Sequence, residues 1–248
     1  MLTSADPAPV RITNREGFAP VVLIGDHAGN LVPEALGDLG VPEAERTRHI
    51  AWDIGIAALG ARLSTALGAP FVEQRYSRLV IDCNRDPDRA DAIPEVSDAA
   101  PIPANHALSP ADRAARVAAI HEPYQQAIAA LLAERRARDQ RTILVALHSF
   151  TPVMQSIARP WHCGLLHHLG NTSLVEPMLT ALRRDPTLVV GDNEPYAMNG
   201  IDHTVPRHAY PDLPYLEIEV RQDLLADDAG VALWTGRVAG ALASVLAG

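Results

Sequence analysis

Two stretches of the chain share one pattern, an uninterrupted apolar run that leads to a histidine. Val21–Ile24 is followed within three residues by His27, and the run 142–147 is followed directly by His148. Short apolar runs rich in β-branched residues are typical of parallel strands that are buried on both faces. Because ligands bind in the crevice beyond the carboxyl ends of such strands, the pattern predicts one site that contains both histidines.

The rest of the pattern alternates helices with strands. A helical period over 43–67 places Asp53 on the apolar face of the predicted helix. Ser109 is a typical helix cap, and Pro123 is expected to kink the helix that follows it. The other predicted elements are strands over 70–74, 78–83, 161–168, 187–190 and 215–221, and helices over 109–138, 172–184 and 227–246.

This alternation predicts a three-layer α/β/α fold with a mixed, mostly parallel central sheet. At 248 residues, a single domain over 1–248 is expected. Residues 1–19 are expected to form an N-terminal arm. Residues 86–108 are rich in proline, aspartate and alanine and have no period, so they are expected to form a long loop that is a candidate lid.

Composition narrows the functional classes. The net charge of −9 argues against nucleic acid and anionic membranes as partners. All basic residues are arginine, which excludes Schiff-base chemistry on lysine and a Walker P-loop. Cys83 and Cys163 are expected to be buried free thiols. We see no signal peptide and no apolar run of membrane-spanning length, so a cytoplasmic location is expected.

The two histidines are candidate metal ligands. A single histidine at a strand end is often only hydrogen-bonded, but two in the same context favour a metal site. Catalytic zinc commonly takes two histidines and one carboxylate and keeps a position open for water. Asp53 is the preferred third ligand and Asp26 the alternative, whereas an ion pair of Asp53 with His49 is the structural explanation. One Zn²⁺ per chain is expected, and another divalent metal would suit the same ligands.

Arginines and glutamates elsewhere are candidates for substrate binding and catalysis. Arg78 and the pair Asn84-Arg85 could recognise an anion, because a guanidinium group binds a carboxylate bidentately. Glu217 and Glu219 alternate with apolar residues on one strand. They either face water or line the crevice, where one is the general base. Glu219 is preferred because it lies nearer the strand end.

The segment 200–208 offers further polar groups. Its candidates for contact with a ligand are His203 and Arg207. An ordinary turn explains the same residues.

Six motifs, in order along residues 20–225, resemble the N-formylglutamate amidohydrolase family. They are Asp26-His27-Ala28-Gly29, Trp52-Asp53-Ile54-Gly55, the stretch 78–85, Leu147-His148-Ser149-Phe150-Thr151-Pro152, Asp192-Asn193-Glu194-Pro195-Tyr196 and the stretch 216–224. The resemblance implies a phosphorylase/hydrolase-like α/β fold related to zinc carboxypeptidases. It also implies hydrolysis of N-formyl-L-glutamate to formate and glutamate, the last step of one histidine-degradation route.

The resemblance also suggests roles. In the wider zinc-carboxypeptidase group an Asn-Arg pair binds the substrate carboxylate, a further arginine lies at the scissile carbonyl, and a late glutamate is the base. Asn84-Arg85, Arg78 and Glu217 or Glu219 look similar to these. The group has a glutamate three residues after its first histidine ligand, where this chain has Asn30. With these roles, the resemblance implies a small anionic N-acyl amino acid as the substrate. The alternative functions are a deacylase for another N-acyl amino acid, a non-catalytic domain that binds acidic ligands, and a phosphorylase-like enzyme.

Overall fold

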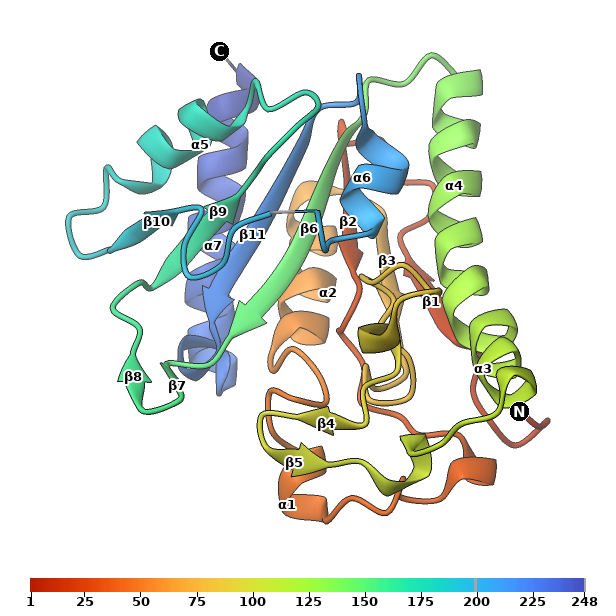
Figure 1. The fold of residues 1–248 in the computed structure, drawn as a ribbon. Coiled ribbons are helices and arrows are strands. Elements are labelled where there is room, and N and C mark those ends of the chain that lie inside the picture. Colours follow the sequence, from red (N-terminus) through yellow and green to blue (C-terminus); the bar gives the residue numbers. More distant parts are fainter. Residues whose placement is uncertain (199, 248) are drawn as a thin grey trace.

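The computed structural model describes residues 1–198 and 200–247. It is built around one seven-stranded sheet that takes strands from most of the chain (Figure 1). In spatial order the strands are β1 (Val10–Thr13), β3 (Phe71–Gln74), β2 (Val21–Gly25), β6 (Ile143–Phe150), β11 (Tyr215–Arg221), β9 (Cys163–Leu166) and β10 (Val190–Asp192).

Most strand pairs in this sheet are parallel. β3, β2, β6 and β11 run parallel to one another, and β10 runs parallel to β9. The two antiparallel pairs are β1 with β3 and β11 with β9. β2 and β6 are buried along their whole length, as continuous apolar runs at the centre of a covered sheet should be. The predicted mixed, mostly parallel sheet is confirmed.

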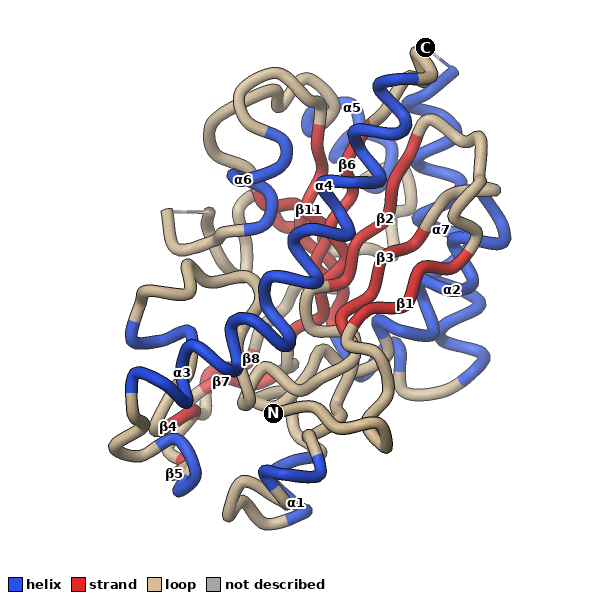
Figure 2. The backbone as a smooth tube through the Cα atoms, turned by 90° about the vertical axis from the view of Figure 1, so that its right-hand side faces the viewer, coloured by secondary structure: helices blue, strands red, loops and turns tan. Residues whose placement is uncertain are grey.

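Helices cover both faces of the sheet (Figure 2). The helices α2 (Ile56–Leu67), α5 (Val175–Leu182) and α7 (Asp228–Ala247) pack with one hydrophobic cluster. The opposite face carries α4 (Glu122–Ala137) and α6 (Thr204–Ala209), which pack with the second cluster. The architecture is therefore the three-layer α/β/α fold that the sequence predicts.

Short elements complete the chain. They are α1 (Glu43–Arg46), α3 (Pro110–Arg116), the hairpins β4–β5 (Val96–Ser97 and Ala100–Pro101) and β7–β8 (Val153–Met154 and Ile157–Ala158), the 3₁₀ turns at Glu34–Leu36, Ala90–Ala92, Pro103–Asn105 and Gln222–Leu225, and a π-helical turn at Val117–His121.

The helix that starts at Ser109 has the expected cap and break. The Ser109 Oγ accepts a hydrogen bond from the Asp112 backbone N–H at 3.1 Å. The π-helical turn ends at His121, and α4 begins with Glu122 and Pro123, so the helix is divided where proline removes a backbone donor.

Several predicted elements are corrected. The expected helix over 43–67 is divided into α1 and α2, and a turn lies between them. The expected strand over 78–83 forms turns instead, although its apolar side chains are buried. Residues 1–19 are not only an arm, because Val10–Thr13 pairs with β3. Residues 86–108 contain short 3₁₀ turns and the β4–β5 hairpin, and their role as a lid stays a prediction.

The C-terminal helix α7 is long and apolar enough to cross a membrane by length and composition alone. It nevertheless packs along α2 and α5, and it buries Val231, Trp234 and Val238 in the first cluster. A core helix passes the same test of length and composition, so α7 is weak evidence for a membrane span.

Candidate metal centre and active site

His27 lies two residues beyond the end of β2, in a turn that packs against the backbone of Arg75. A Cβ atom at Gly29 would lie 2.0 Å from the carbonyl oxygen of Arg75, so only glycine allows this close approach. Leu31 then donates a backbone hydrogen bond to the same carbonyl at 3.1 Å. This contact fixes the loop that carries His27, which is 3% exposed.

Asp53 reaches the same place from the turn before α2. Its backbone N–H donates to the carbonyl oxygen of His27 at 2.9 Å. Gly55 completes the turn with a left-handed φ of 87°, and a Cβ atom there would lie 2.4 Å from Leu225 Cβ. Asp53 is buried as predicted, but a turn and not a helix face directs it inward. Among the described residues, Asp53 and His49 form no ion pair. The acid near His49 is Asp98, whose Oδ2 lies 3.7 Å from His49 Nε2.

His148 lies inside β6 near its carboxyl end. Ser149, the next residue, ties this end of the strand to the Asp53 turn. Its backbone N–H donates to Asp53 Oδ2 at 3.3 Å, and its Oγ donates to the carbonyl oxygen of Ile54 at 2.9 Å. Ser149 thus has a structural role here.

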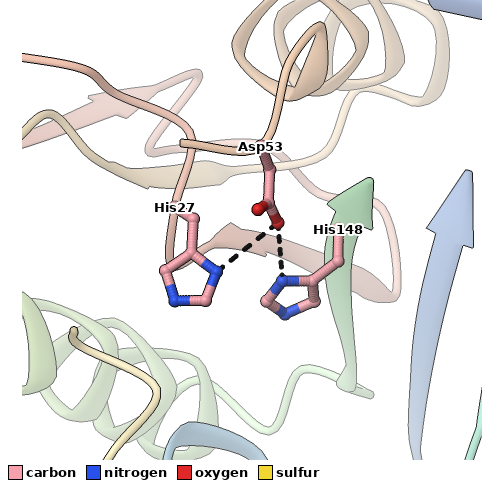
Figure 3. Close-up of side chains that lie close together, drawn as sticks. All are labelled: His27, Asp53 and His148. Carbon is pink, nitrogen blue, oxygen red and sulfur yellow. Dashed lines mark hydrogen bonds and ion pairs between the residues drawn. The ribbon is translucent and has the colours of Figure 1, made fainter. Parts of the chain in front are cut away.

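The three predicted ligands converge on one point (Figure 3). Asp53 Oδ2 lies 2.9 Å from His148 Nδ1 and 3.5 Å from His27 Nδ1, and one ligand atom from each residue lies within 4.8 Å of the others. Tetrahedral zinc with bonds of about 2.0–2.2 Å needs ligand atoms about 3.3–3.6 Å apart. His27 Nδ1 is also buried with no hydrogen-bond partner among the described residues. The donor set therefore fits a zinc ion.

Each ring turns its other nitrogen toward a second carboxylate. His27 Nε2 lies 2.7 Å from Asp82 Oδ1, and His148 Nε2 lies 3.3 Å from Asp26 Oδ2. Carboxylates in this position orient a metal-binding histidine and fix its tautomer. Asp26, the alternative ligand, thus lies behind His148 instead of beside Asp53.

The charges of the group are mutually stabilised. Burial would raise the pKa of the Asp53 carboxyl, but His27 and His148 outweigh burial and hold it below its usual range. Burial would lower the pKa of His148, yet Asp26 and Asp53 raise it well above its ordinary value. Burial and Arg78 lower the pKa of His27, while Asp82 and Asp53 raise it, and the net shift is upward. A cation at the shared point would satisfy the same carboxylate.

A cavity of about 420 Å³ opens on the three residues. Glu217 and Glu219 line it and are 2% and 6% exposed, so both face the crevice and neither faces bulk water. Burial raises the pKa of Glu219 to about 7, and it raises the pKa of Glu217 well above its usual range. Glu219 is paired in register with His148, whereas Glu217 is paired with Ala146, deeper in the sheet.

Two arginines, Arg78 and Arg85, line the cavity, and each has carboxylates of the protein nearby. Arg78 Nε and Nη2 both donate to Asp82 Oδ2, at 3.0 and 2.6 Å, and Arg78 Nη1 lies 3.8 Å from Asp53 Oδ1. Arg85 lies 3.6 Å from Asp91 and 3.8 Å from Asp202, beyond hydrogen-bond distance. Arg85 Nη1 donates to the carbonyl oxygen of Asn84 at 2.9 Å, so the available donors are the remaining N–H groups of the guanidinium, between the two acids.

Asn84 lines the cavity, and its amide is hydrogen-bonded within the protein. It is 4% exposed, and its Oδ1 accepts backbone hydrogen bonds from His203 and Thr204 at 2.9 and 3.0 Å. Its Nδ2 donates to Asp202 Oδ1 at 3.2 Å. These bonds occupy the amide, so Asn84 holds the 202–204 loop.

His203 and Arg207 are not brought to the cavity. The His203 ring packs on His121 at a centroid distance of 5.3 Å, and Arg207 Nη1 lies 3.4 Å from Glu122 Oε1. Neither is among the residues that line the cavity. Both side chains lie against the junction of the π-helical turn and α4, where His121 and Glu122 are adjacent.

Other residues of the site have no clear local signal. Tyr196 lines the cavity, and its hydroxyl accepts a hydrogen bond from Arg159 Nη1 at 2.8 Å. It belongs to one of the six motifs, but no spacing gives it a role. Thr204 contacts Asp26 across 178 residues, which no sequence pattern indicates.

Comparisons with known proteins identify one family and its fold. Residues 19–226 match the family model for N-formylglutamate amidohydrolase. No curated protein sequence matches the chain. A gene product of Agrobacterium tumefaciens of known structure is 35% identical, with a TM-score of 0.95, over 99% of this chain and 98% of that one. N-formylglutamate amidohydrolase from Ralstonia eutropha is 19% identical, with a TM-score of 0.67, over 97% of both chains, which shows a shared fold.

Proposed function

The chain belongs to the N-formylglutamate amidohydrolase family and is a hydrolase of amide bonds, and on this premise we propose that it is a zinc-dependent deformylase of a small N-acyl amino acid. N-formyl-L-glutamate is the first substrate to test, with formate and glutamate as products. The observation that carries the proposal is the convergence of His27, Asp53 and His148 at the floor of a cavity lined by two glutamates and two arginines.

His27 and His148 would hold the metal through Nδ1, and Asp53 through Oδ2. When bound, zinc supplies Lewis-acid chemistry, because it polarises a carbonyl and lowers the pKa of water at its open position. Asp82 and Asp26 keep the two rings in place from behind. One zinc ion per chain is expected from this set of three.

Glu219 is our candidate for the general base. Besides burial, the charges of His148, Asp53, His27 and Arg78 act on its pKa, and it is nearer the strand end than Glu217. A pKa of about 7 lets a carboxylate take a proton from water and return it to the leaving amine near neutral pH. Burial raises the pKa of Glu217, and the charges of His148, Asp202, Glu219 and Asp26 also act on it, so we propose that Glu217 contributes to the electrostatics of the site without being the base.

The arginines divide the recognition of the substrate. Arg78 lies beside Asp53 and is placed to stabilise negative charge on the carbonyl oxygen as the amide is attacked. Arg85 has free donors between Asp91 and Asp202 and is our candidate for binding a substrate carboxylate. We place the reaction in the cytoplasm, as the last step of a histidine-degradation route, with no role for nucleic acid or a membrane.

A deacylase for a bulkier N-acyl amino acid is the second candidate. Apolar side chains form part of the cavity wall, which could accept a longer acyl group or an apolar side chain. They are Ile50, Pro94, Phe150, Met154, Leu166 and Ile201.

One experiment separates these functions from a domain that only binds acidic ligands. Metal content is measured on the purified protein, and formate release from N-formyl-L-glutamate is followed with and without a chelator. We expect about one zinc per chain, and turnover that stops on chelation and returns with zinc. Full activity without metal would contradict the mechanism, and turnover of longer N-acyl amino acids alone would select the second candidate.

A further inference from the structure

A row of buried polar side chains leads from His148 away from the cavity. It passes through Asp26 after β2, Thr204 at the start of α6 and Gln125 in α4, and it ends at His208 in α6. Asp26, Thr204 and Gln125 are at most 1% exposed. Buried polar groups are normally paired, but this row also has a direction, which can be followed from donor to acceptor.

Gln125 sets the direction at the outer end. Its Nε2 donates to the carbonyl oxygen of Cys83 at 2.8 Å, and a carbonyl can only accept, so this end of the side chain is the amide nitrogen. Gln125 Oε1 therefore faces His208 Nε2, at 2.7 Å. Because Oε1 is an acceptor, His208 must carry its proton on Nε2.

Thr204 continues the row in the same direction. Its Oγ1 accepts from Gln125 Nε2 at 3.2 Å and lies 2.5 Å from Asp26 Oδ1. The carbonyl oxygen of Cys83 is a second acceptor within reach, at 3.2 Å, but Gln125 already donates to it. The shorter distance assigns the hydroxyl proton to Asp26.

Asp26 ends the row, with Thr204 at one carboxylate oxygen and His148 at the other. Its Oδ2 lies 3.3 Å from His148 Nε2, an ion-pair distance, and neither atom makes a hydrogen bond among the described residues. Without a metal, His148 Nδ1 lies 2.9 Å from Asp53 Oδ2, and because an ionised carboxylate can only accept, Nδ1 carries a proton there. If Nδ1 holds a metal instead, the proton that the ring keeps must lie on Nε2, which faces Asp26.

We propose that Thr204 and Gln125 are positioning residues, which act through Asp26 to hold His148 in the tautomer that leaves Nδ1 free to bind metal. This inference rests on the proposed metal centre. A purely structural role, in which the same bonds only join α6 and α4 to the sheet, predicts a loss of stability alone. The positioning role also predicts a loss of metal affinity.

The test compares Thr204→Val, which keeps the shape of the side chain and removes the hydroxyl, with Thr204→Ser, which restores it. Zinc affinity is measured by competition with a chromogenic chelator. We expect the Kd for zinc to rise about tenfold in Thr204→Val, since loss of such an outer partner costs about 10–100-fold in metal affinity, and to return close to the wild-type value in Thr204→Ser.

Ser64→Ala is the matched control. Ser64 is fully buried in α2, and its Oγ donates to the carbonyl oxygen of Ala69 at 2.6 Å, away from the row. It should lower the unfolding midpoint and leave the Kd for zinc unchanged. A Thr204→Val protein that is folded and binds zinc like the wild type would overturn the positioning role.

A second measurement needs no variant. Histidine ¹⁵N–¹H correlation spectra of the zinc-loaded wild type should show a proton on Nε2 of both His148 and His208. A proton on Nδ1 of His148 would overturn the inference. A wild type that binds no zinc would refute the proposed function, and the positioning role with it. A wild type and a Thr204→Val variant that bind zinc alike would refute the positioning role alone, so the two failures are distinguishable.

Discussion

The two histidines of the candidate metal centre occupy the same geometry but are held by different means. Both turn Nδ1 toward Asp53 and Nε2 toward a second carboxylate. The carboxylate behind His27 is Asp82, which accepts two hydrogen bonds from Arg78. The carboxylate behind His148 is Asp26, for which the corresponding donor is the neutral hydroxyl of Thr204.

The difference separates a side of the site that faces the substrate from a side that faces the core. Arg78 lines the cavity and its side chain is 26% exposed, so a bound substrate can compete for the donors that hold Asp82. Thr204 is fully buried, so a bound substrate cannot compete for the hydrogen bond that holds Asp26 behind His148. Substitutions on the His27 side should therefore change metal and substrate binding together, and those behind His148 should change metal binding alone.

Removal of either imidazole ring should have the largest effect, and it should be the same on both sides of the site. His27→Ala and His148→Ala are each expected to abolish bound zinc and turnover, because two remaining ligands do not make a catalytic zinc site. Metal content and formate release measure both effects. His106→Ala is the control, since His106 is 78% exposed and pairs with Glu95 outside the cavity. Retention of zinc by either ligand variant would refute that residue as a ligand.

The next effect distinguishes the two glutamates on the His148 side. Glu219→Gln should lower kcat by about 10²–10⁴-fold, the usual contribution of a general base, with zinc content unchanged. Glu217→Gln should have a smaller effect on kcat, because Glu217 lies two residues deeper along β11. Steady-state kinetics on the same substrate measures both. A larger loss in Glu217→Gln would reverse the assignment of the base.

Asp82→Asn and Asp26→Asn compare the two supports directly. Each should weaken zinc binding by about 10–100-fold. Asp82→Asn also removes the main partner of Arg78, so KM should change with it, whereas Asp26→Asn should leave KM near the wild-type value. Zinc competition and steady-state kinetics, at saturating zinc, give both quantities. Equal changes in KM would show that the two sides are not separated.

The strands and the histidine pair were predictable because their signals are local. A buried parallel strand needs only an apolar run, and its carboxyl end then places the following side chain in the crevice. The apolar run within 78–83 shows the limit of this reasoning. Leu79, Val80 and Ile81 are buried, but they pack from turns against the second cluster, because tertiary packing overrides β-propensity.

The supports behind the histidines could not be predicted in the same way. Asp53 was expected to point inward from a helix, but Gly55 ends that period and a turn directs it. Asp82 accepts hydrogen bonds from Arg78, four residues before it, but its contact with His27 spans 55 residues. The contact of Thr204 with Asp26 spans 178 residues. Such contacts come from the arrangement of the strands and leave no periodic pattern.

The smallest expected effect concerns His208, at the outer end of the row of polar side chains behind His148. Burial and the charge of Arg207 lower the pKa of His208 to about 4, although Asp26 acts in the opposite direction and His203 adds to the lowering. Between about pH 6.5 and pH 4 the unfolded chain therefore binds a proton at this histidine that the folded chain does not. The free energy of unfolding should fall as pH falls through this window.

His208→Gln keeps an N–H donor for Gln125 and removes the titration. The variant should lose less stability than the wild type between neutral pH and pH about 4, by roughly 1–3 kcal/mol. Urea unfolding at several pH values measures the difference, and His106→Gln serves as an exposed control. His121 and His203 also have lowered pKa values because they are buried, but they titrate in the wild type and the variant alike. An unchanged pH dependence would mean that His208 accepts a proton in the folded chain. Because a doubly protonated ring still donates from Nε2, the hydrogen bond to Gln125 would persist, but the row would then end in a charge and would no longer be a neutral support.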